Sequence, residues 1–542
     1  MVPRAAQRAL PATVTALVLA TSGCGGSTVT IEDRDLELVT TTPAAAGSAG
    51  RINWMLDAEP LTLDTDYQGG TTEDTVVANV CERLYQLQPD LTVRPWLVGE
   101  PEQPDPTTFV YPVREGVTFH DGTQLTAEDV VFSMERHAEE GHDESDEYSN
   151  VIGIEQTGPM EVTVTLEEPD AQFKYRMAGD GGIVFNAEQV EHLGEAYGNP
   201  GQPDACSGPY RLKEWQAGSS LTLERYDDYW NEELTPLTEE IRFTWGGEWA
   251  MVNSLRTGAA DGAYLDNPSV APALIAHPDL GVHFGETTSS WQLFPTDRGP
   301  VADARIRTAL SLALDREGMV AAAFRGIAEP WKLPIGSGTF GYARAAFEAA
   351  YDRIDNAPLR PSEEHLARAR ELVARAGAPE QPIVVANDGS SVGNVLANGV
   401  RDAALRIGLE VDIRTLPPAQ FTELFSAQEA RAGIDLIIDD WYISKPDALG
   451  MYDNALPDSV NNYVGFDSAE FADTFARASA SYDDTVRAEQ VVRLQQLYLD
   501  EMVSIPVAMA PTTLVLNGRL SGSPVSIAYL TYPWAADLGA AT

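Results

Sequence analysis

The chain has 542 residues and a formal net charge of −46, with 36 Lys and Arg against 82 Asp and Glu. One hydrophobic core rarely grows to this length, so we expect two or three domains. The charge argues against nucleic acid or an anionic membrane surface as a direct partner, since each phosphate contact calls for Lys or Arg. Solubility at high salt is the simplest interpretation of the charge, and a cationic substrate is the alternative.

Residues 1–23 have the features of a signal peptide. Arg4 and Arg8 precede a mostly apolar run that is too short to cross a bilayer, because a spanning helix takes roughly 20 apolar residues. The run ends in Ala-Thr-Ser-Gly-Cys24, which resembles a bacterial lipobox, although Thr21 stands where leucine is preferred. The resemblance implies that Cys24 is diacylated and anchors the protein. An ordinary cleaved signal is the alternative.

Residues 24–48 are rich in Gly, Ser, Thr and Ala, a composition typical of a flexible tether. No later segment is apolar enough to span a membrane, so we expect the mature part to be soluble. The remaining cysteines are Cys81 and Cys206. Outside the membrane two cysteines are permitted to pair, and their spacing leaves open whether they do.

Predicted elements alternate along the globular part. Thr126 and Asp129 form a capping box that starts a helix over residues 126–138. A second helix is predicted over residues 306–324, with Asp303 as its cap. Strands are predicted over residues 51–56, 107–113, 162–166, 208–215 and 220–225. Further helices are predicted over residues 363–376, 470–480 and 484–501, followed by a strand-like tail over residues 503–516.

The segment over residues 382–438 has a βαβαβ pattern, which predicts parallel strands with helices on their faces. Such sheets bind ligands beyond the carboxyl ends of their strands, so the residues after Ile438 are well placed to face a ligand. The predicted elements are a strand at 382–386, a helix at 392–407, a strand at 409–416, a helix at 419–430 and a strand at 434–438.

Three stretches carry a recognisable pattern. Residues 113–136 read VREGVTFHDGTQLTAEDVVFSMER, residues 207–215 read SGPYRLKEW with Tyr229-Trp230 beyond, and residues 303–316 end in Ala-Leu-Asp-Arg. Together they resemble the extracellular solute-binding proteins of family 5, which serve ABC importers of peptides and nickel. Most of these residues suit turns and packing, and we expect His120 to pack in a turn instead of binding a metal.

The resemblance implies an α/β, two-lobed periplasmic-binding-protein-like fold of class II, the large peptide-binding type with an extra inserted domain. Solute binds between the lobes, which then close around it. Cys81 and Cys206 would belong to the same lobe, which keeps their disulfide plausible. The predicted division is 1–23 signal peptide, 24–48 lipid-anchored tether, 49–88 with 203–285 and 503–542 as lobe 1, 89–202 as the inserted domain, and 286–502 as lobe 2.

In peptide-binding members an Asp in a Trp-x-Ala-Asp-Tyr-type segment grips the α-amino group of the peptide. When that Trp is matched to Trp441, Ser444 stands where the Asp is expected. Asp440 or Asp447 could take over the role, or the solute lacks a free α-amine. The other candidates for the cleft are aromatic, because such walls accept varied side chains; they are Tyr442, Tyr67, Trp245, Trp249, Trp291 and Tyr463.

These features predict a substrate-binding lipoprotein that captures an oligopeptide or peptide-like solute. It would be a monomer held at the outer side of the cell membrane, extracellular or periplasmic, and would deliver solute to an ABC permease and ATPase. We expect no nucleic acid, no cofactor and no metal. Nickel, haem or a sugar as solute, and a receptor without transport, are alternatives. A lipid-anchored hydrolase is a remote one, since no Gly-x-Ser-x-Gly, His-Glu-x-x-His or Walker motif is present.

Overall fold

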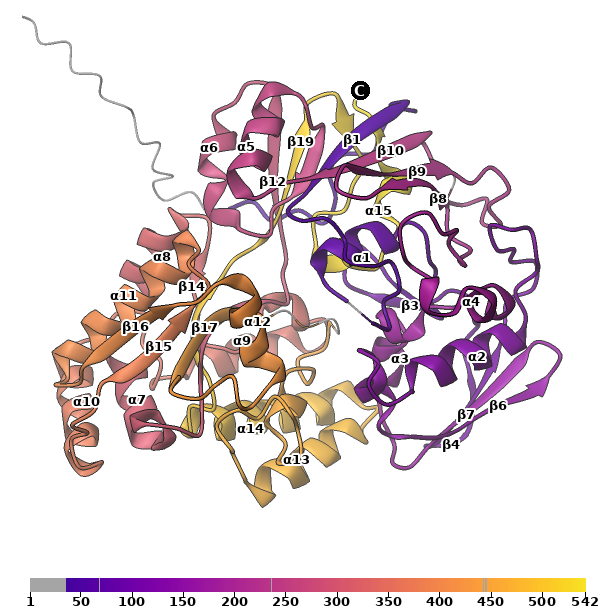
Figure 1. The fold of residues 1–542 in the computed structure, drawn as a ribbon. Coiled ribbons are helices and arrows are strands. Elements are labelled where there is room, and N and C mark those ends of the chain that lie inside the picture. Colours follow the sequence, from indigo (N-terminus) through magenta and orange to yellow (C-terminus); the bar gives the residue numbers. More distant parts are fainter. Residues whose placement is uncertain (1–35, 68, 235, 442, 444–445) are drawn as a thin grey trace, which may run out of the picture.

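The molecule consists of two lobes and a smaller inserted domain (Figure 1), which confirms the predicted α/β two-lobed fold. The lobes lie beside each other, and the inserted domain extends from lobe 1 and also touches lobe 2. The structure is a computed structural model, and it describes residues 36–67, 69–234, 236–441, 443 and 446–542.

Lobe 1 is built on a seven-stranded sheet whose strands come from distant parts of the chain. The central strand β1 runs parallel to β10 and β11, and the other neighbours are antiparallel. In spatial order the strands are β12 (Leu280–Gly285), β19 (Thr512–Asn517), β11 (Gly262–Tyr264), β1 (Arg51–Leu56), β10 (Glu240–Trp245), β9 (Ser220–Arg225) and β8 (Tyr210–Gln216). Its helices are α1 (Thr71–Val77), α5 (Glu248–Thr257), α6 (Pro272–Ile275) and α15 (Trp534–Asp537).

The inserted domain has an antiparallel sheet on which α2 (Ala127–His137) packs. The predicted capping box of this helix is present, and the backbone N–H of Thr126 donates to Asp129 Oδ2 at 2.9 Å. The strands lie in the order β4 (Glu102–Asp105), β5 (Thr108–Pro112), β7 (Glu161–Leu166) and β6 (Val151–Gly158). The remaining helices of this region are α3 (Phe173–Arg176) and α4 (Ala187–Leu193).

The inserted domain is shorter than the predicted 89–202. Its hydrophobic core ends at Val184, whereas Phe185, Val190 and Tyr197 are buried in the core of lobe 1. The segment around α4 therefore belongs to lobe 1. The sequence pattern did not reveal this because a short amphipathic helix fits either core.

Lobe 2 contains the predicted βαβαβ segment, in which β15 pairs in parallel with both β16 and β17. The sheet has six strands in the order β14 (Glu329–Pro330), β18 (Ile505–Met509), β13 (Ser290–Pro295), β17 (Leu436–Trp441), β15 (Ile383–Asn387) and β16 (Val411–Thr415). Its helices are α7 (Ala304–Ala313), α8 (Arg316–Phe324), α9 (Arg344–Asp352), α10 (Glu363–Arg375), α11 (Ser391–Arg406), α12 (Pro418–Ser426), α13 (Ala469–Ser479) and α14 (Asp484–Asp500).

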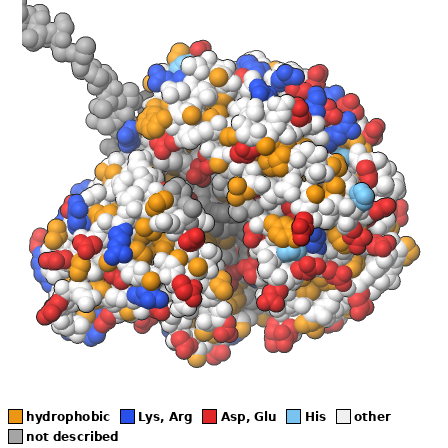
Figure 2. Space-filling model, viewed as in Figure 1, with side chains coloured by type: hydrophobic (Ala, Val, Ile, Leu, Met, Phe, Trp, Pro, Cys, Tyr) orange, Lys and Arg blue, Asp and Glu red, His pale blue; other side chains and the backbone are white. Residues whose placement is uncertain are grey.

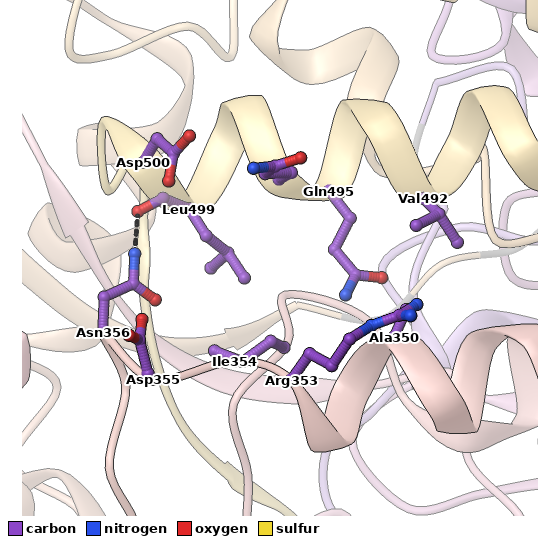
Figure 3. Close-up of a pocket in the computed structure, with 10 residues that line it drawn as sticks. Ala350, Arg353, Ile354, Asp355, Asn356, Val492, Gln495, Leu499 and Asp500 are labelled. Carbon is purple, nitrogen blue, oxygen red and sulfur yellow. Dashed lines mark hydrogen bonds between the residues drawn. The ribbon is translucent and has the colours of Figure 1, made fainter.

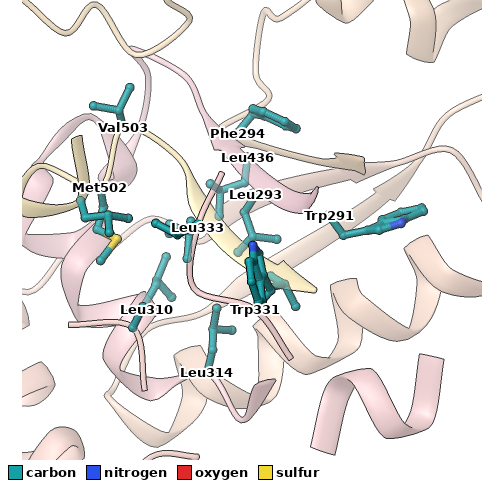
Figure 4. Close-up of a cluster of buried hydrophobic side chains, with 14 of the residues drawn as sticks. Trp291, Leu293, Phe294, Leu310, Leu314, Trp331, Leu333, Leu436, Met502 and Val503 are labelled. Carbon is teal, nitrogen blue, oxygen red and sulfur yellow. The ribbon is translucent and has the colours of Figure 1, made fainter. Parts of the chain in front are cut away.

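The core of lobe 2 forms where the helices pack on the middle of this sheet. Figure 4 shows side chains of this core, among them Leu310 of α7, Leu293 of β13 and Leu436 of β17, and all three are fully buried. The helix predicted over 306–324 is broken in two, because Asp315 leaves the helical conformation and caps α8 by accepting from the Gly318 backbone N–H at 3.1 Å.

The last part of the chain corrects the predicted lobe boundary. Strand β18 pairs with β13 in the lobe 2 sheet, so residues 503–509 belong to lobe 2 and not to lobe 1. The chain returns to lobe 1 between β18 and β19, beside the segment that joins β12 to β13. The two crossings touch, since the Thr512 hydroxyl donates to the Glu286 carbonyl at 3.1 Å. They are the natural hinge between the lobes.

The end of the predicted tether lies against lobe 1. The backbone N–H of Val39 donates to the Phe284 carbonyl at 2.8 Å, and that of Thr42 donates to the Ser523 carbonyl at 2.9 Å. The Thr42 side chain is buried. The expectation of a flexible tether reaching residue 48 is therefore wrong for residues 39–48, because small polar residues also suit an extended segment laid along a sheet.

A disulfide joins Cys81 to Cys206 inside lobe 1, where both side chains are buried. It links positions 125 residues apart and spans the whole insertion. A loop of this length makes the cross-link worth about 4–5 kcal/mol in a chain-entropy account. The bond holds the core of lobe 1 together around the inserted domain.

Candidate functional site: a carboxylate-lined cleft

Lobe 2 closes against the rest of the molecule at two separate places. The Ser269 hydroxyl of lobe 1 lies 3.4 Å from that of Ser391 at the start of α11. The Ala171 backbone N–H of the inserted domain donates to the Ser479 carbonyl of α13 at 2.7 Å. Figure 2 shows the surface hollowed between lobe 2 and the rest, with acidic side chains along the borders. The hollow is the cleft in which a solute could be enclosed.

Carboxylates stand at the ends of strands that face this cleft. In lobe 1, Asp57 directly follows β1 and Asp266 follows β11. In lobe 2, Asp388 directly follows β15, and Asp439 and Asp440 lie at the end of β17. Strands β1 and β11 are parallel, as are β15 and β17, so each pair delivers its side chains to one edge of its sheet.

The pKa shifts show that the two sets of carboxylates face each other. Enclosure by protein raises the pKa of Asp266 to about 7, and the charges of Asp440, Asp57 and Asp388 add to the shift. Enclosure and the charge of Asp388 raise the pKa of Asp440 to about 6. The surfaces of Asp266 and Asp440 are nevertheless open to solvent, as expected for groups on the walls of a narrow, solvent-filled cleft.

The lobe 1 wall combines these carboxylates with aromatic rings. The Thr72 hydroxyl of α1 donates to Asp57 Oδ1 at 2.7 Å and fixes that side chain. Tyr264 stacks on Tyr529 with ring centroids 3.8 Å apart, and both rings line a small cavity together with Asp57 and Asp266. The wall can therefore cover an apolar group while its carboxylates accept hydrogen bonds from a cation.

The lobe 2 wall carries two of the predicted residues. Trp441 is partly exposed and contacts Phe294, with centroids 5.6 Å apart, and Phe425, with centroids 6.2 Å apart. Tyr463 is buried beside the same Phe425, and with Trp441 it lines a cavity of about 20 Å³. The structure therefore brings Trp441 and Tyr463 together at one cavity, while Asp440, the preceding residue of β17, is not among the residues that line it.

Asp447 and Trp291 lie inside lobe 2. Asp447 is fully buried, where its Oδ1 accepts from the Tyr342 hydroxyl at 3.2 Å and its Oδ2 lies 3.4 Å from Arg487 Nη2. Trp291 is 8% exposed and packs edge-on against Phe324. Both side chains are already held by protein partners, which distinguishes them from the open Asp440.

The other predicted residues are dispersed. Trp245 is partly buried against the lobe 1 core, while Trp249 of α5 and Tyr67 are exposed. Tyr67 contacts the ring of His142. Tyr442 and Ser444 lie outside the described residues, as does the lipidation candidate Cys24.

The signature segment, residues 113–136, stabilises the fold through the partners of its polar side chains. Both ring nitrogens of His120 are hydrogen-bonded, Nδ1 to Asp204 Oδ1 at 2.5 Å and Nε2 to the Gly208 carbonyl at 2.8 Å. Arg136 pairs with Asp64 and Asp66, which are both buried. These partners leave no free group for a ligand, as expected for residues that pack in turns.

A further cavity of lobe 2 lies away from the cleft (Figure 3). It measures about 320 Å³ and is formed between α9 with the segment after it and α14, within lobe 2. Arg353, Asp355 and Gln495 are among its lining residues. In this close-up Asn356 donates to the Leu499 carbonyl, which ties the segment after α9 to α14.

Two features are absent from the residues that the structure describes. Over that part of the chain, no group of three or more His, Cys, Asp and Glu side chains is arranged to hold a metal ion. Among the helices of the same residues, none is both long and apolar enough to cross a membrane.

Residues 88–463 match the family described as bacterial extracellular solute-binding proteins, family 5 Middle. The chain belongs to this family. It is accordingly an extracellular or periplasmic substrate-binding protein of the ABC-importer type and not an enzyme.

Relatives of known sequence or structure align with most of this chain. The periplasmic oligopeptide-binding protein OppA of Salmonella typhimurium is 23% identical over 85% of this chain and 87% of its own length. The structure of AppA of Bacillus subtilis in complex with a nonapeptide superimposes with a TM-score of 0.75 at 20% identity, covering 92% of this chain and all of AppA. AgaA of A. tumefaciens R10, in complex with agropinic acid, gives a TM-score of 0.77 at 22% identity, over 91% of this chain and 99% of AgaA.

The sequence prediction missed three of the five cleft carboxylates, Asp57, Asp266 and Asp388. A usable signal was present, because Asp57 directly follows a predicted strand, as Asp439 does, and Asp388 lies two residues after the end of another. Asp266 follows β11, which has only three residues and was not predicted. Its place in the cleft depends on contacts between lobes that no local pattern encodes.

Proposed function

We propose that this protein captures an oligopeptide or a peptide-like compound in the cleft and passes it to its permease. The α-amino group of the solute would be bound by Asp440, which is open to solvent at the end of β17. An ammonium is a donor of three hydrogen bonds, and a carboxylate in an enclosed cleft is its natural acceptor. The proposal favours Asp440 over Asp447, because Asp440 is open to solvent and Asp447 is buried with Tyr342 and Arg487.

The observation that carries the proposal is the concentration of carboxylates at the cleft edges of both lobes. Carboxylates without basic side chains beside them lack a compensating charge. Such an arrangement is useful in a binding protein only if the solute supplies the positive charge. A peptide does so through its α-amine, and the aromatic walls suit its side chains.

A thermal-shift screen tests this function. A solute that binds only the folded state stabilises it by RT ln(1 + [L]/Kd), about 2.7 kcal/mol at one hundred times Kd. We expect peptides of two to eight residues to raise the melting temperature. Sugars and Ni²⁺ are the controls. A screen in which no peptide shifts the melt at millimolar concentration would rule out the peptide assignment.

We propose further that Cys24 carries a lipid that keeps the protein at the outer face of the membrane as a monomer near its permease. The lipobox-like sequence before Cys24 supports this anchor. Cys24→Ser should move the protein from the membrane fraction to the medium or periplasm. Mass spectrometry of the N-terminal peptide should find diacylglyceryl on Cys24, and an unmodified N-terminus at another residue would contradict the anchor.

A further inference from the structure

A second acid-lined cavity lies between the lobe 1 core and the inserted domain. It has a volume of about 100 Å³, enough for a small polar group. Its walls come from α1, from η1 (Ser145–Tyr148) with the residue before it, from η2 (Asp180–Gly182), and from the C-terminal segment that contains η8 (Ile527–Leu530). The lining residues include Asp74, Glu144, Asp180, Leu87, Leu530 and Thr531.

The cavity holds more negative than positive charge. Asp180 pairs with the buried Arg83, whose Nη2 lies 2.5 Å from Asp180 Oδ1. Glu144 Oε2 accepts the backbone N–H of Gly181 at 3.0 Å. Asp74 is 5% exposed; its carboxyl lies within hydrogen-bonding reach of the Asp180 carboxyl, and no N–H or hydroxyl donor among the described residues reaches its Oδ1. Burial, and then the charge of Asp180, raise the pKa of Asp74 well above its usual range.

The hydroxyl of Thr531 in the same cavity also lacks a hydrogen-bond partner among the described residues. Thr531 is 7% exposed. Its carbonyl is already used, since Arg83 and Gln86 donate to it at 3.1 and 2.9 Å. Buried polar atoms are rarely left unsatisfied, and here a carboxylate and a hydroxyl in one cavity share that condition.

Two elements, α1 and η8, contribute residues both to this cavity and to the cleft cavity. Helix α1 contributes Thr72 and Thr75 to the cleft cavity that contains Asp57 and Asp266, and it contributes Asp74 to this one. On the other side, η8 contributes Tyr529 to the first cavity and Leu530 to the second. One solute could therefore occupy the cleft and extend a side chain past α1 and η8.

We infer that the solute is basic and places a second cation, the ammonium or guanidinium of a side chain, in the cavity of Asp74 and Thr531. The inference rests on the proposed peptide function and narrows its substrate class. An ammonium offers donors and no acceptors, so it fits two oxygens that lack donors. A carboxylate side chain would meet Asp74, Glu144 and Asp180, and a hydrocarbon would leave both oxygens unsatisfied.

Matched tripeptides test the inference by calorimetry on the exported protein. Trialanine is varied at each position in turn with lysine, with norleucine as the uncharged lysine analogue, and with glutamate. At one of the three positions, we expect the lysine tripeptide to bind at least tenfold more tightly than the norleucine tripeptide. The glutamate tripeptide should bind more weakly than both. Asp74→Asn should bring the ratio of lysine to norleucine affinity close to one without weakening norleucine.

Two further variants separate binding from folding. Thr531→Val should reduce the lysine preference about threefold, and Glu489→Gln on the exposed face of α14 should leave it unchanged. Equal affinity for lysine and norleucine at every position would overturn the basic-side-chain inference while leaving peptide capture intact. A lysine preference that survives in both folded cavity variants would overturn it equally. If no tripeptide binds, the peptide proposal fails and this inference fails with it.

Discussion

The carboxylates that pair with the end of α2, at Arg136 and His137, and the carboxylates of the cleft have opposite environments. Burial would raise the pKa of Asp66, but His137 and Arg136 outweigh it and lower that pKa. The pKa values of Asp266 and Asp440 are raised instead, to about 7 and about 6, because enclosure by protein disfavours the charged form and the charged neighbours are other carboxylates. Paired charges stabilise the fold, whereas the unpaired carboxylates of the cleft are available to bind a cationic solute.

The largest expected effect comes from breaking a pair in the first region. Arg136→Met leaves Asp64 and Asp66 buried without their guanidinium, and we expect a loss of about 3–5 kcal/mol in the free energy of unfolding. Urea denaturation measures this change. The control is Arg225→Met, which breaks the exposed pair with Asp227 and should cost below about 1 kcal/mol. Similar losses in both variants would contradict a structural role for the signature charges.

In the cleft the same kind of change should affect binding instead of stability. Asp440→Asn removes the proposed amine ligand, and we expect peptide affinity to fall about ten- to a hundredfold, the value of a charge-assisted hydrogen bond. Stability should stay the same or rise at neutral pH, because a repelling charge is removed. Titration calorimetry and urea denaturation together decide the point. Unchanged affinity with lowered stability would place Asp440 with the structural residues.

The sequence predicted much of the fold but fewer of the residues of the candidate site. The segment over 382–438 has strong periodicity, so its strands and helices were placed within a few residues, and the signature marked the two-lobed fold. Strand β18 was assigned to the wrong lobe because its apolar sequence fits the sheet of either lobe. Asp74 and Thr531 are 457 positions apart, and only the folded chain brings them to one cavity.

A smaller effect is expected in the pH dependence of stability without solute. A carboxyl whose folded-state pKa is raised from 3.8 to about 7 holds its proton more tightly in the folded state. Its contribution is therefore complete below about pH 4 and is lost as the pH rises toward 7. Asp266→Asn should reduce the pH dependence of the melting temperature over this range. The dependence should not vanish, because Asp57, Asp388, Asp439 and Asp440 still contribute. An unchanged slope would contradict the assigned pKa.

The central claim is that the cleft carboxylates are reserved for a cation of the solute. Proton release on binding tests it most directly, through calorimetry at pH 6 in buffers of different ionisation enthalpy. A bound ammonium stabilises the charged carboxylates, so groups with pKa values of about 6 and 7 must give up protons. We predict release of protons when a peptide binds at pH 6, less release at pH 8, and a reduced release in Asp440→Asn. Zero release or proton uptake at pH 6 would contradict the account.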